Sequence, residues 1–527
     1  MLKKLGSSLP NNRYSCSEVK RVFAKDSRTK WTSVVGLEVH AQINTVSKLF
    51  SGASTNFSSP VNTNVSLFDC AIPGTLPVLN KKCVEYGVLT ALALNCQVSP
   101  VSMFDRKHYF YADMPAGYQI TQQRYPLATN GKLEFQVFTP GIHKAPYKTE
   151  VHIKQLQLEQ DSGKSLHDVD RSLVDLNRAG VPLMEVVFEP DLKDGEEAAA
   201  LVKELVTILQ RIGTCSCKME EGALRVDANV SVHQKGEALG TRAEIKNIGS
   251  VRGVAGAVKY EIERQIQIKE SGGVVENETR AWDASRKITV AMRDKEQQQD
   301  YRYMPEPNLP PLHVAMGPVG HGCVNADELR QTMPELPEQT RCRLRDSLGL
   351  TLEQSVILVG DAALLQLFEG ASRNRNLDGK LLANLLINDF LTTLHKMNLD
   401  PTQHTVDCEG FAEIAELLQD GRITRNTAKR VLEAVLQGTD KTPLEVAQIY
   451  IFDIYIVKEN DWMQITDRGD LLKLCEEVLR ENEKVVKQYK AGKSKVFKAL
   501  MGCVAAKSKQ RADMAKCDAL LKELLSK

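Results

Sequence analysis

The stretch LRVDANVSVH, residues 224–233, alternates apolar and polar side chains without a break. This two-residue period predicts a β-strand with one face in the core. After a turn-rich link, TRAEIKNI, residues 241–248, continues the pattern and places Arg242, Glu244 and Lys246 on one face. The two stretches together predict an antiparallel hairpin. Its polar face is either a solvated surface with cross-strand ion pairs or a bed for a ligand.

A second strand is predicted at VVGLEVHAQI, residues 34–43, where Glu38 and His40 share one face and apolar side chains share the other. An antiparallel strand with one wet side would explain this pattern. A site that uses the carboxylate and the imidazole would explain it as well. This stretch alone does not distinguish a solvent-exposed face from a functional site, so the other predicted strands have to be considered.

A third strand is predicted at QLQLEQDSGKS, residues 155–165, where Glu159 and Asp161 fall on the same face. Lys164 follows within a Gly-Lys-Ser fragment that resembles the end of a phosphate loop. The first glycine of that motif is missing, because position 158 is leucine. We therefore predict no P-loop here.

The nearly continuous apolar run PLMEVVF, residues 182–188, is typical of a strand that is covered on both sides, yet it contains Glu185. A buried, isolated carboxylate costs several kcal/mol unless a cation, hydrogen-bond donors or a proton meets it. The partner of Glu185 is either a structural Arg or Lys or a divalent metal. If the acids of the three strands converge on one sheet face, they form an oxygen-rich site suited to Mg²⁺ and nucleotide phosphates. The alternation shows only that each strand offers its acids to a single face.

The composition is that of an ordinary globular protein, with 527 residues, 42% hydrophobic residues and a net charge of +1. No apolar run is long enough for a membrane span, so we predict none. The twelve cysteines include no C-x-x-C pair, and we predict no zinc site. Residues 1–30 contain eight Lys or Arg against two acids, which is typical of an organelle import segment or of a disordered basic tail.

Two regions follow along the chain. Up to about residue 311 strands are mixed with a few helices, for example GEEAAALVKELVTILQRIG, residues 195–213, and a second helix from Val251 to Gly272. Beyond that point the pattern is helical almost to the end. The proline-rich segment at residues 301–312 predicts an extended exit from the first region.

Several longer blocks resemble the signature blocks of the B subunit of aspartyl/glutamyl-tRNA amidotransferase, the GatB family, and with the basic N-terminus most resemble its mitochondrial form. In chain order they are GLEVHAQ, FDRKHYFYADMPAGYQITQ, LEQDSGKS, SLVDLNRAGVPLMEVV, MEEGALRVDANVSV, EIKNIGS and DYRYMPEPNLPPL. The resemblance covers nearly the whole chain after the import-like segment. It implies a ligase of the mitochondrial matrix, in which ATP activates the glutamate side chain on mischarged Glu-tRNA(Gln) as an acyl phosphate and ammonia then displaces phosphate.

The resemblance implies two protein partners in a heterotrimeric amidotransferase. The amidase subunit, a glutaminase known as the A subunit, would supply ammonia by hydrolysing glutamine. The small subunit, known as the C subunit, would brace the pair.

Site residues are implied by the resemblance as well. The family metal site, for Mg²⁺ with Mn²⁺ as an alternative, falls on Glu38, His40, Glu159 and Glu185. Contacts to phosphate or substrate fall on the following residues: Arg106, Lys107, Asp161, Lys164, Arg242 and Lys246. For each basic residue taken singly, a surface ion pair is the competing explanation.

The fold that the resemblance implies is α+β: a curved antiparallel sheet domain of the glutamine synthetase and guanido kinase type, followed by all-α domains that end in a YqeY-like tail. We expect a targeting segment at 1–30, a catalytic domain at 31–320, a helical linker at 321–375 and a helical domain at 376–527.

The C-terminal segment, residues 484–527, contains twelve Lys or Arg and three acids. Such a surface attracts phosphate backbones, and the resemblance makes tRNA the expected partner. The expected contacts are Lys490, Lys493, Lys495, Lys498, Lys507 and Lys509. A basic, solubilising helix pair is the alternative. At the level of function, a glutamine synthetase-like ligase for a free small molecule and a tRNA-binding scaffold without catalysis remain as rivals.

Overall fold

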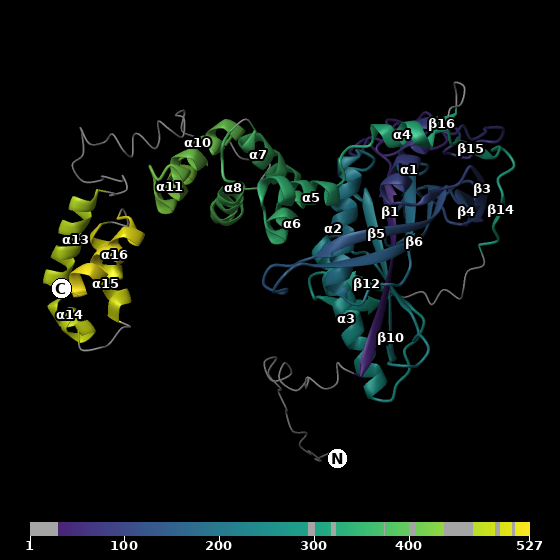
Figure 1. Cartoon of the computed structure of the whole chain (residues 1–527). Helices are drawn as coiled ribbons and strands as arrows, with labels where there is room; N and C mark the ends of the chain where they lie inside the picture. Colours follow the sequence, from purple (N-terminus) through teal and green to yellow (C-terminus); the bar gives the residue numbers. More distant parts are fainter. Residues whose placement is uncertain are drawn as a thin grey trace, which may run out of the picture. The chain divides into compact units, whose positions relative to one another are not determined.

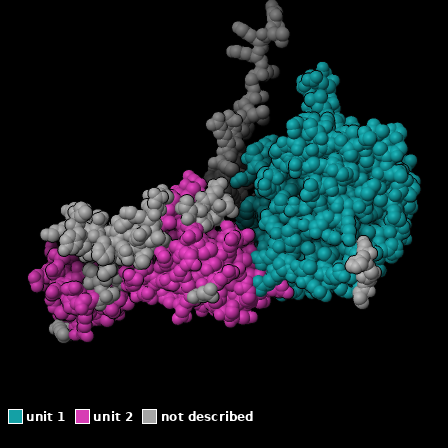
Figure 2. All heavy atoms as spheres, turned by 90° about the horizontal axis from the view of Figure 1, so that it is seen from above, with its two compact units in different colours: residues 1–336 teal, residues 337–527 magenta. Residues whose placement is uncertain are grey.

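The computed structural model describes residues 30–292, 301–317, 323–373, 375–399, 406–436, 467–490, 496–508 and 512–526. The chain divides into two compact units, residues 1–336 and residues 337–527 (Figure 2). The expected targeting segment lies outside the described residues, apart from Lys30.

A mixed sheet forms the centre of the first unit (Figure 1). The nine strands that the described residues contribute are, in spatial order, β13 (Ile288–Ala291), β12 (Thr279–Asp283), β11 (Ala243–Lys246), β10 (Leu224–Gln234), β1 (Trp31–Gln42), β9 (Pro182–Phe188), β6 (Tyr147–Gln160), β5 (Ala128–Val137) and β2 (Gln97–Val98). β1 pairs antiparallel with both β10 and β9, and β9 pairs antiparallel with β6. The four acid-bearing stretches of the sequence are therefore adjacent strands.

The predicted hairpin is confirmed, because β10 and β11 pair antiparallel with Asn229 opposite Glu244. The other pairs of this sheet are antiparallel, as expected, but β11 and β12 run parallel, which was not expected. A parallel pair needs a long crossover, and helix α3 (Val251–Glu270) supplies it between these two strands.

Three helices pack with the apolar face of the sheet in one core: α1 (Lys81–Ala93), α2 (Gly195–Arg211) and α3. Leu37 and Val39 of β1 and Val226 of β10 are at most 1% exposed and belong to this core. The predicted helix at residues 195–213 begins after Asp194, whose side chain accepts hydrogen bonds from the backbone of Glu196 and Glu197. These caps satisfy backbone donors that the first helical turn leaves free.

A smaller sheet contains β3 (Val101–His108), β4 (Tyr118–Tyr125), β14 (Met304–Pro305), β15 (Leu312–Ala315) and β16 (Val324–Asn325). The proline-rich segment is extended, as predicted, but the expected exit is wrong because β14 and β15 pair back onto β3. The short hairpin of β7 (Lys164–His167) and β8 (Ser172–Asp175), the 3₁₀ turn at Met219–Glu221 and helix α4 (Ala326–Thr332) complete the first unit.

The second unit is helical. Its described helices are α5 (Pro337–Leu348), α6 (Leu352–Val359), α7 (Ala362–Ser372), α8 (Gly379–Asn384), the π-helical turn η4 (Leu385–Phe390), α9 (Leu391–Met397), α10 (Cys408–Gln419), α11 (Arg425–Leu436), α13 (Arg468–Glu481), α14 (Glu483–Lys490), α15 (Phe497–Lys507) and α16 (Met514–Ser526). One hydrophobic core joins the helices up to α11, and a separate core joins α13 to α16. Among the described helices, none is by itself long and apolar enough to cross a bilayer, and the pair α6 and α7 meets that test only jointly, across a bend of 115°.

Candidate active site

Four polar side chains form a row across the face of the sheet opposite α1, α2 and α3. His40 of β1 lies directly opposite Arg225 of β10 on one side and Glu185 of β9 on the other. Glu185 in turn lies opposite Gln157 of β6. Because neighbouring strands are about 4.8 Å apart, the register alone brings side chains from four distant segments into contact range.

Glu159, two residues beyond Gln157 on β6, completes a compact group. The Nε2 atom of His40 is 3.9 Å from a carboxylate oxygen of Glu159 and 3.9 Å from one of Glu185. The three potential ligand atoms lie within 4.8 Å of one another. Within the described residues no Arg or Lys forms an ion pair with Glu185, whose carboxylate accepts a hydrogen bond of 2.7 Å from Gln157. The described residues therefore show no direct ion pair between Glu185 and a basic residue, although the charge of Lys107 is close enough to lower the pKa of Glu185 in part.

The hydrogen bonding and the pKa values of His40, Glu159 and Glu185 are compatible with a bound divalent cation. One oxygen of Glu159 accepts a hydrogen bond from Gln119, while its Oε2 is buried and has no hydrogen-bond partner among the described residues. Burial, with a contribution from Arg225, lowers the pKa of His40 to about 3, so that its imidazole is neutral at pH 7. Burial and the Glu159 charge raise the pKa of Glu185 to about 8. Two carboxylates and a neutral imidazole around one gap can bind a divalent cation, which would relieve the repulsion between the acids.

Glu38 lies outside this group. It shares the face of β1 with His40, and one of its carboxylate oxygens accepts a hydrogen bond of 3.0 Å from Asn229. Its cross-strand neighbour is Asp227. Burial raises the pKa of Asp227 to about 6, and the positive charge of Lys246 offsets part of that rise. The structure thus brings together three of the four expected metal ligands and places the fourth beside them.

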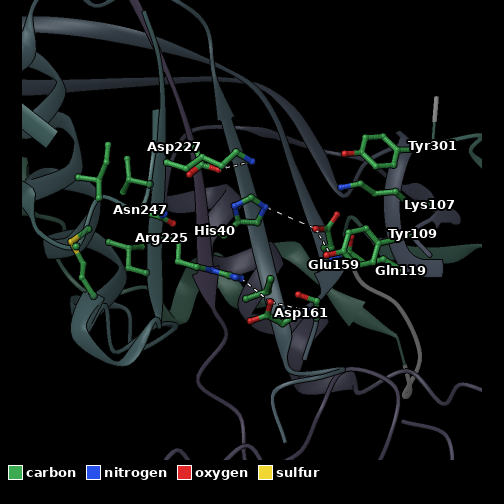
Figure 3. A pocket seen from close by; sticks show the side chains of 18 residues that line it. His40, Lys107, Tyr109, Gln119, Glu159, Asp161, Arg225, Asp227, Asn247 and Tyr301 are labelled. Atoms are coloured by element: carbon green, nitrogen blue, oxygen red, sulfur yellow. Dashed lines mark hydrogen bonds and ion pairs between the residues drawn. The ribbon is translucent and has the colours of Figure 1, made fainter. Parts of the chain in front are cut away.

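A pocket of about 530 Å³ opens beside the group (Figure 3). Its polar and charged lining residues are His40, Lys107, Tyr109, Gln119, Glu159, Asp161, Ser162, Arg225, Asp227, Lys246, Asn247 and Tyr301. Burial opposes the charge on Lys107, but the nearby Glu159 and Glu185 raise its pKa overall. The Nζ atom of Lys107 also lies 5.0 Å from the centre of the Tyr301 ring. The pocket therefore combines a potential cation site with several fixed positive charges.

Of the six residues expected to contact phosphate or substrate, three line this pocket: Lys107, Asp161 and Lys246. The other three do not. Arg106 is engaged with Glu306 through two hydrogen bonds of 2.6 and 3.0 Å. Lys164 is exposed on β7, and Arg242 is exposed before β11. Arg106 therefore forms a structural ion pair, which was the competing explanation for this residue.

Several polar pocket residues were not predicted as site residues, among them Gln119, Arg225 and Tyr301. Arg225 could have been found, because it shares the alternating face of LRVDANVSVH with Asp227 and lies on the same predicted sheet. Gln119 and Tyr301 reach the pocket from the smaller sheet and from the segment before β14, and no local pattern reports that placement.

Of the six lysines expected to bind tRNA, Lys490 and Lys498 are exposed on α14 and α15. Lys507 is also exposed but forms ion pairs of 3.0 and 2.6 Å with Glu477 and Glu481 of α13. The remaining three, Lys493, Lys495 and Lys509, lie outside the described residues.

The pocket lies in a part of the chain that matches a known protein family. A family model described as "GatB/GatE catalytic domain" matches residues 33–318, and a second, described as "GatB domain", matches residues 366–525. The chain belongs to the GatB family. Every pocket residue named above lies within the part that matches the GatB/GatE catalytic domain.

Whole-length GatB relatives agree with these matches. The chain is 55% identical to the B subunit of the mitochondrial glutamyl-tRNA(Gln) amidotransferase of Aedes aegypti, over 94% of this chain and 93% of that protein. It is 46% identical to the protein of the same name from Homo sapiens, over 94% of this chain and 88% of that protein. The B subunit of the aspartyl/glutamyl-tRNA(Asn/Gln) amidotransferase of Rickettsia typhi is 42% identical over 95% of this chain and 99% of that protein.

Proposed function

We propose that this chain is the ATP-dependent amidating subunit of a mitochondrial glutamyl-tRNA(Gln) amidotransferase, a ligase that takes its amide nitrogen from glutamine. The names of its full-length relatives support the activity and the mitochondrial location. The observation that carries the proposal is the convergence of His40, Glu159 and Glu185 beside a pocket with positive charges, inside the GatB/GatE catalytic domain.

Two steps make up the reaction. An oxygen of the glutamate side chain of Glu-tRNA(Gln) attacks the γ-phosphorus of ATP, the bond to the β-phosphate oxygen breaks, and ADP leaves. Ammonia then attacks the acyl carbon, phosphate leaves with the electrons of the carbon–oxygen bond, and the nitrogen loses a proton to give the amide. In the first step negative charge is spread over the oxygens of the transferring phosphoryl group. Lys107 and Lys246 supply fixed positive charge at the pocket for it.

The cation that we propose at His40, Glu159 and Glu185 is Mg²⁺, with Mn²⁺ as an alternative because one ligand is an imidazole. When bound, such a cation supplies charge neutralisation for nucleotide phosphates. Glu38, two residues before His40 on the same face of β1, would add a further carboxylate near that cation. The prediction that the chain binds no zinc stands beside this proposal and can be tested by metal analysis of the purified protein.

The partners that we propose are those of the family: the amidase subunit as the source of ammonia, the small subunit, and mischarged Glu-tRNA(Gln). Exposed Lys490 and Lys498 would bind the tRNA backbone, together with Lys493, Lys495 and Lys509 of the same basic segment, whereas Lys507 is paired with acids of α13. We also propose the glutamine synthetase and guanido kinase lineage for the first unit. Support for that lineage is a sheet with helices on one face and charged groups on the other.

The test is ATP hydrolysis by the chain assembled with its amidase and small subunits, measured alone, with Glu-tRNA(Gln) and with free glutamate. Uncharged tRNA(Gln) is the control for the tRNA body. Stimulation by Glu-tRNA(Gln) that exceeds the effect of uncharged tRNA supports the proposal. Stimulation by free glutamate alone would instead indicate a small-molecule ligase, and a complex that binds tRNA without hydrolysing ATP would indicate a scaffold.

A further inference from the structure

Arg225 is a charged residue of the pocket with unfilled hydrogen-bonding capacity. It lies on β10 directly opposite His40, and its side chain is 35% exposed. Its Nη2 atom donates a hydrogen bond of 2.9 Å to Asp161. Its Nε atom is buried and has no hydrogen-bond partner among the described residues. A guanidinium has five N–H donors, so this contact leaves most of them available.

Asp161, the hydrogen-bond partner of Arg225, also contacts a second guanidinium group. The carboxylate of Asp161 is nearly buried and also faces Arg178, at 3.6 Å. The Asp161 carboxylate is thus shared between two guanidinium groups, of which Arg225 lines the pocket.

The pair Arg106–Glu306 in the same unit shows what a saturated structural ion pair looks like. There Nε and Nη2 both donate to the carboxylate, in the two-point geometry that Arg and carboxylates favour. Arg225 forms only a one-point contact with Asp161, and its guanidinium lies at the pocket (Figure 3). A purely structural role for Arg225 would leave its buried Nε–H as an unexplained cost.

We propose that Arg225 is a catalytic residue that donates hydrogen bonds to the transferring γ-phosphoryl group, and that Asp161 is the positioning residue that aims it. This inference rests on the proposed function. While the bond from the glutamate oxygen to phosphorus forms and the bond to ADP breaks, charge spreads over the three remaining phosphoryl oxygens. A guanidinium one strand away from His40 is placed to meet those oxygens next to the cation group. A planar, permanently charged donor suits that task better than an ammonium.

The test uses the complete heterotrimeric complex and compares Arg225→Gln and Arg225→Lys with a matched control, Arg252→Gln. Arg252 forms a similar one-point contact of 3.2 Å with Glu196, but it is 64% exposed and lies on α3, away from the pocket. We expect Arg225→Gln to lower kcat for hydrolysis of ATP in the presence of Glu-tRNA(Gln) by about 10³-fold. Arg225→Lys should recover a minor part of this loss, and guanidinium ion added to Arg225→Gln should restore some activity. Arg252→Gln should stay within about twofold of the wild type.

Binding measurements separate a catalytic role from a structural one. Arg225→Gln should bind a non-hydrolysable ATP analogue at least about tenfold more weakly, with the affinity for ADP nearly unchanged, because ADP lacks the γ-phosphoryl group. Equal losses for both nucleotides, or retention of at least half the hydrolysis rate, would overturn the inference. If the wild-type complex shows no hydrolysis with Glu-tRNA(Gln), the proposed function fails. In that case, comparing the affinities for the analogue and for ADP would still test Arg225. If Arg225→Gln did not weaken binding of the analogue more than binding of ADP, the proposed role of Arg225 would be overturned.

Discussion

At the scale of single residues, the candidate site is defined by acids that the fold holds too close together. Glu159 and Glu185 approach His40 from two strands, and the side chain of Glu159 is only 3% exposed. Without a cation, burial and the repulsion from Glu159 raise the pKa of Glu185 to about 8. A sheet that served only as a scaffold would gain stability by placing apolar side chains here.

The raised pKa of Glu185 predicts a pH-dependent stability. The ordinary pKa of 4.5 applies to the unfolded chain, so the folded state binds the proton more tightly than the unfolded state does. The destabilisation caused by Glu185 is therefore absent below about pH 4.5, grows as the pH rises and is complete above about pH 8. Thermal unfolding in EDTA should show that Glu185→Gln melts within about 1 °C of the wild type at pH 5 and at least about 2 °C above it at pH 8.5. A difference that does not change with pH would contradict this assignment.

At the scale of elements, the site depends on strand register, because a shift of one residue would turn His40 and Glu185 to the opposite face of the sheet. Helices behind the sheet help to hold that register. Gly195, the first residue of α2, lies so close to α3 that an added Cβ would come within 2.3 Å of the backbone oxygen of Ala255. A backbone atom cannot move aside as a flexible side chain can.

Gly195→Ala should therefore force α2 and α3 apart and lower the free energy of unfolding by about 1–3 kcal/mol. Gly52→Ala is the control, because an added Cβ there meets nothing within 4 Å. Chemical denaturation of the two variants checks this prediction. Equal stability of both would mean that the contact between α2 and α3 is looser than the structure indicates.

The alternating stretches predicted the strands, the hairpin and the face that each acid occupies, because a two-residue period is a local property. Two helices were predictable for the same reason, from their apolar spacing and end signals. The order of the strands was not, since it depends on pairing between segments that are far apart in the sequence, such as β1 and β9. Neither the parallel pair that α3 connects nor the position of Tyr301 at the pocket has a local signature. The convergence of His40, Glu159 and Glu185 thus came from the structure, and the family resemblance only implied it.

At the scale of the whole molecule, fewer lysines of the C-terminal helices are free to bind tRNA phosphates than the number in the sequence suggests. Lys507 already pairs with Glu477 and Glu481, whereas Lys490 and Lys498 are exposed on the same group of helices. A lysine that releases counterions from a phosphate backbone must not be neutralised beforehand by an acid.

We expect Lys490→Gln combined with Lys498→Gln to weaken tRNA binding by the complete complex and to reduce the slope of log K against log salt by about 2. Lys507→Gln, the control on the same helices, should change that slope by less than about 0.5. Filter binding across a salt series would measure both. An equal change for Lys507→Gln would show that its ion pairs open when tRNA binds.

The central claim is that His40, Glu159 and Glu185 bind one divalent cation together. Its most direct test is a titration of the complete complex with Mn²⁺, followed by electron paramagnetic resonance, for the wild type and for Glu159→Gln. Glu150→Gln is the control, because Glu150 lies on the same strand, is 50% exposed and pairs with Lys132. We predict one tight site in the wild type and in the control, and an affinity at least about tenfold lower in Glu159→Gln. An unchanged Mn²⁺ affinity in Glu159→Gln would contradict the account.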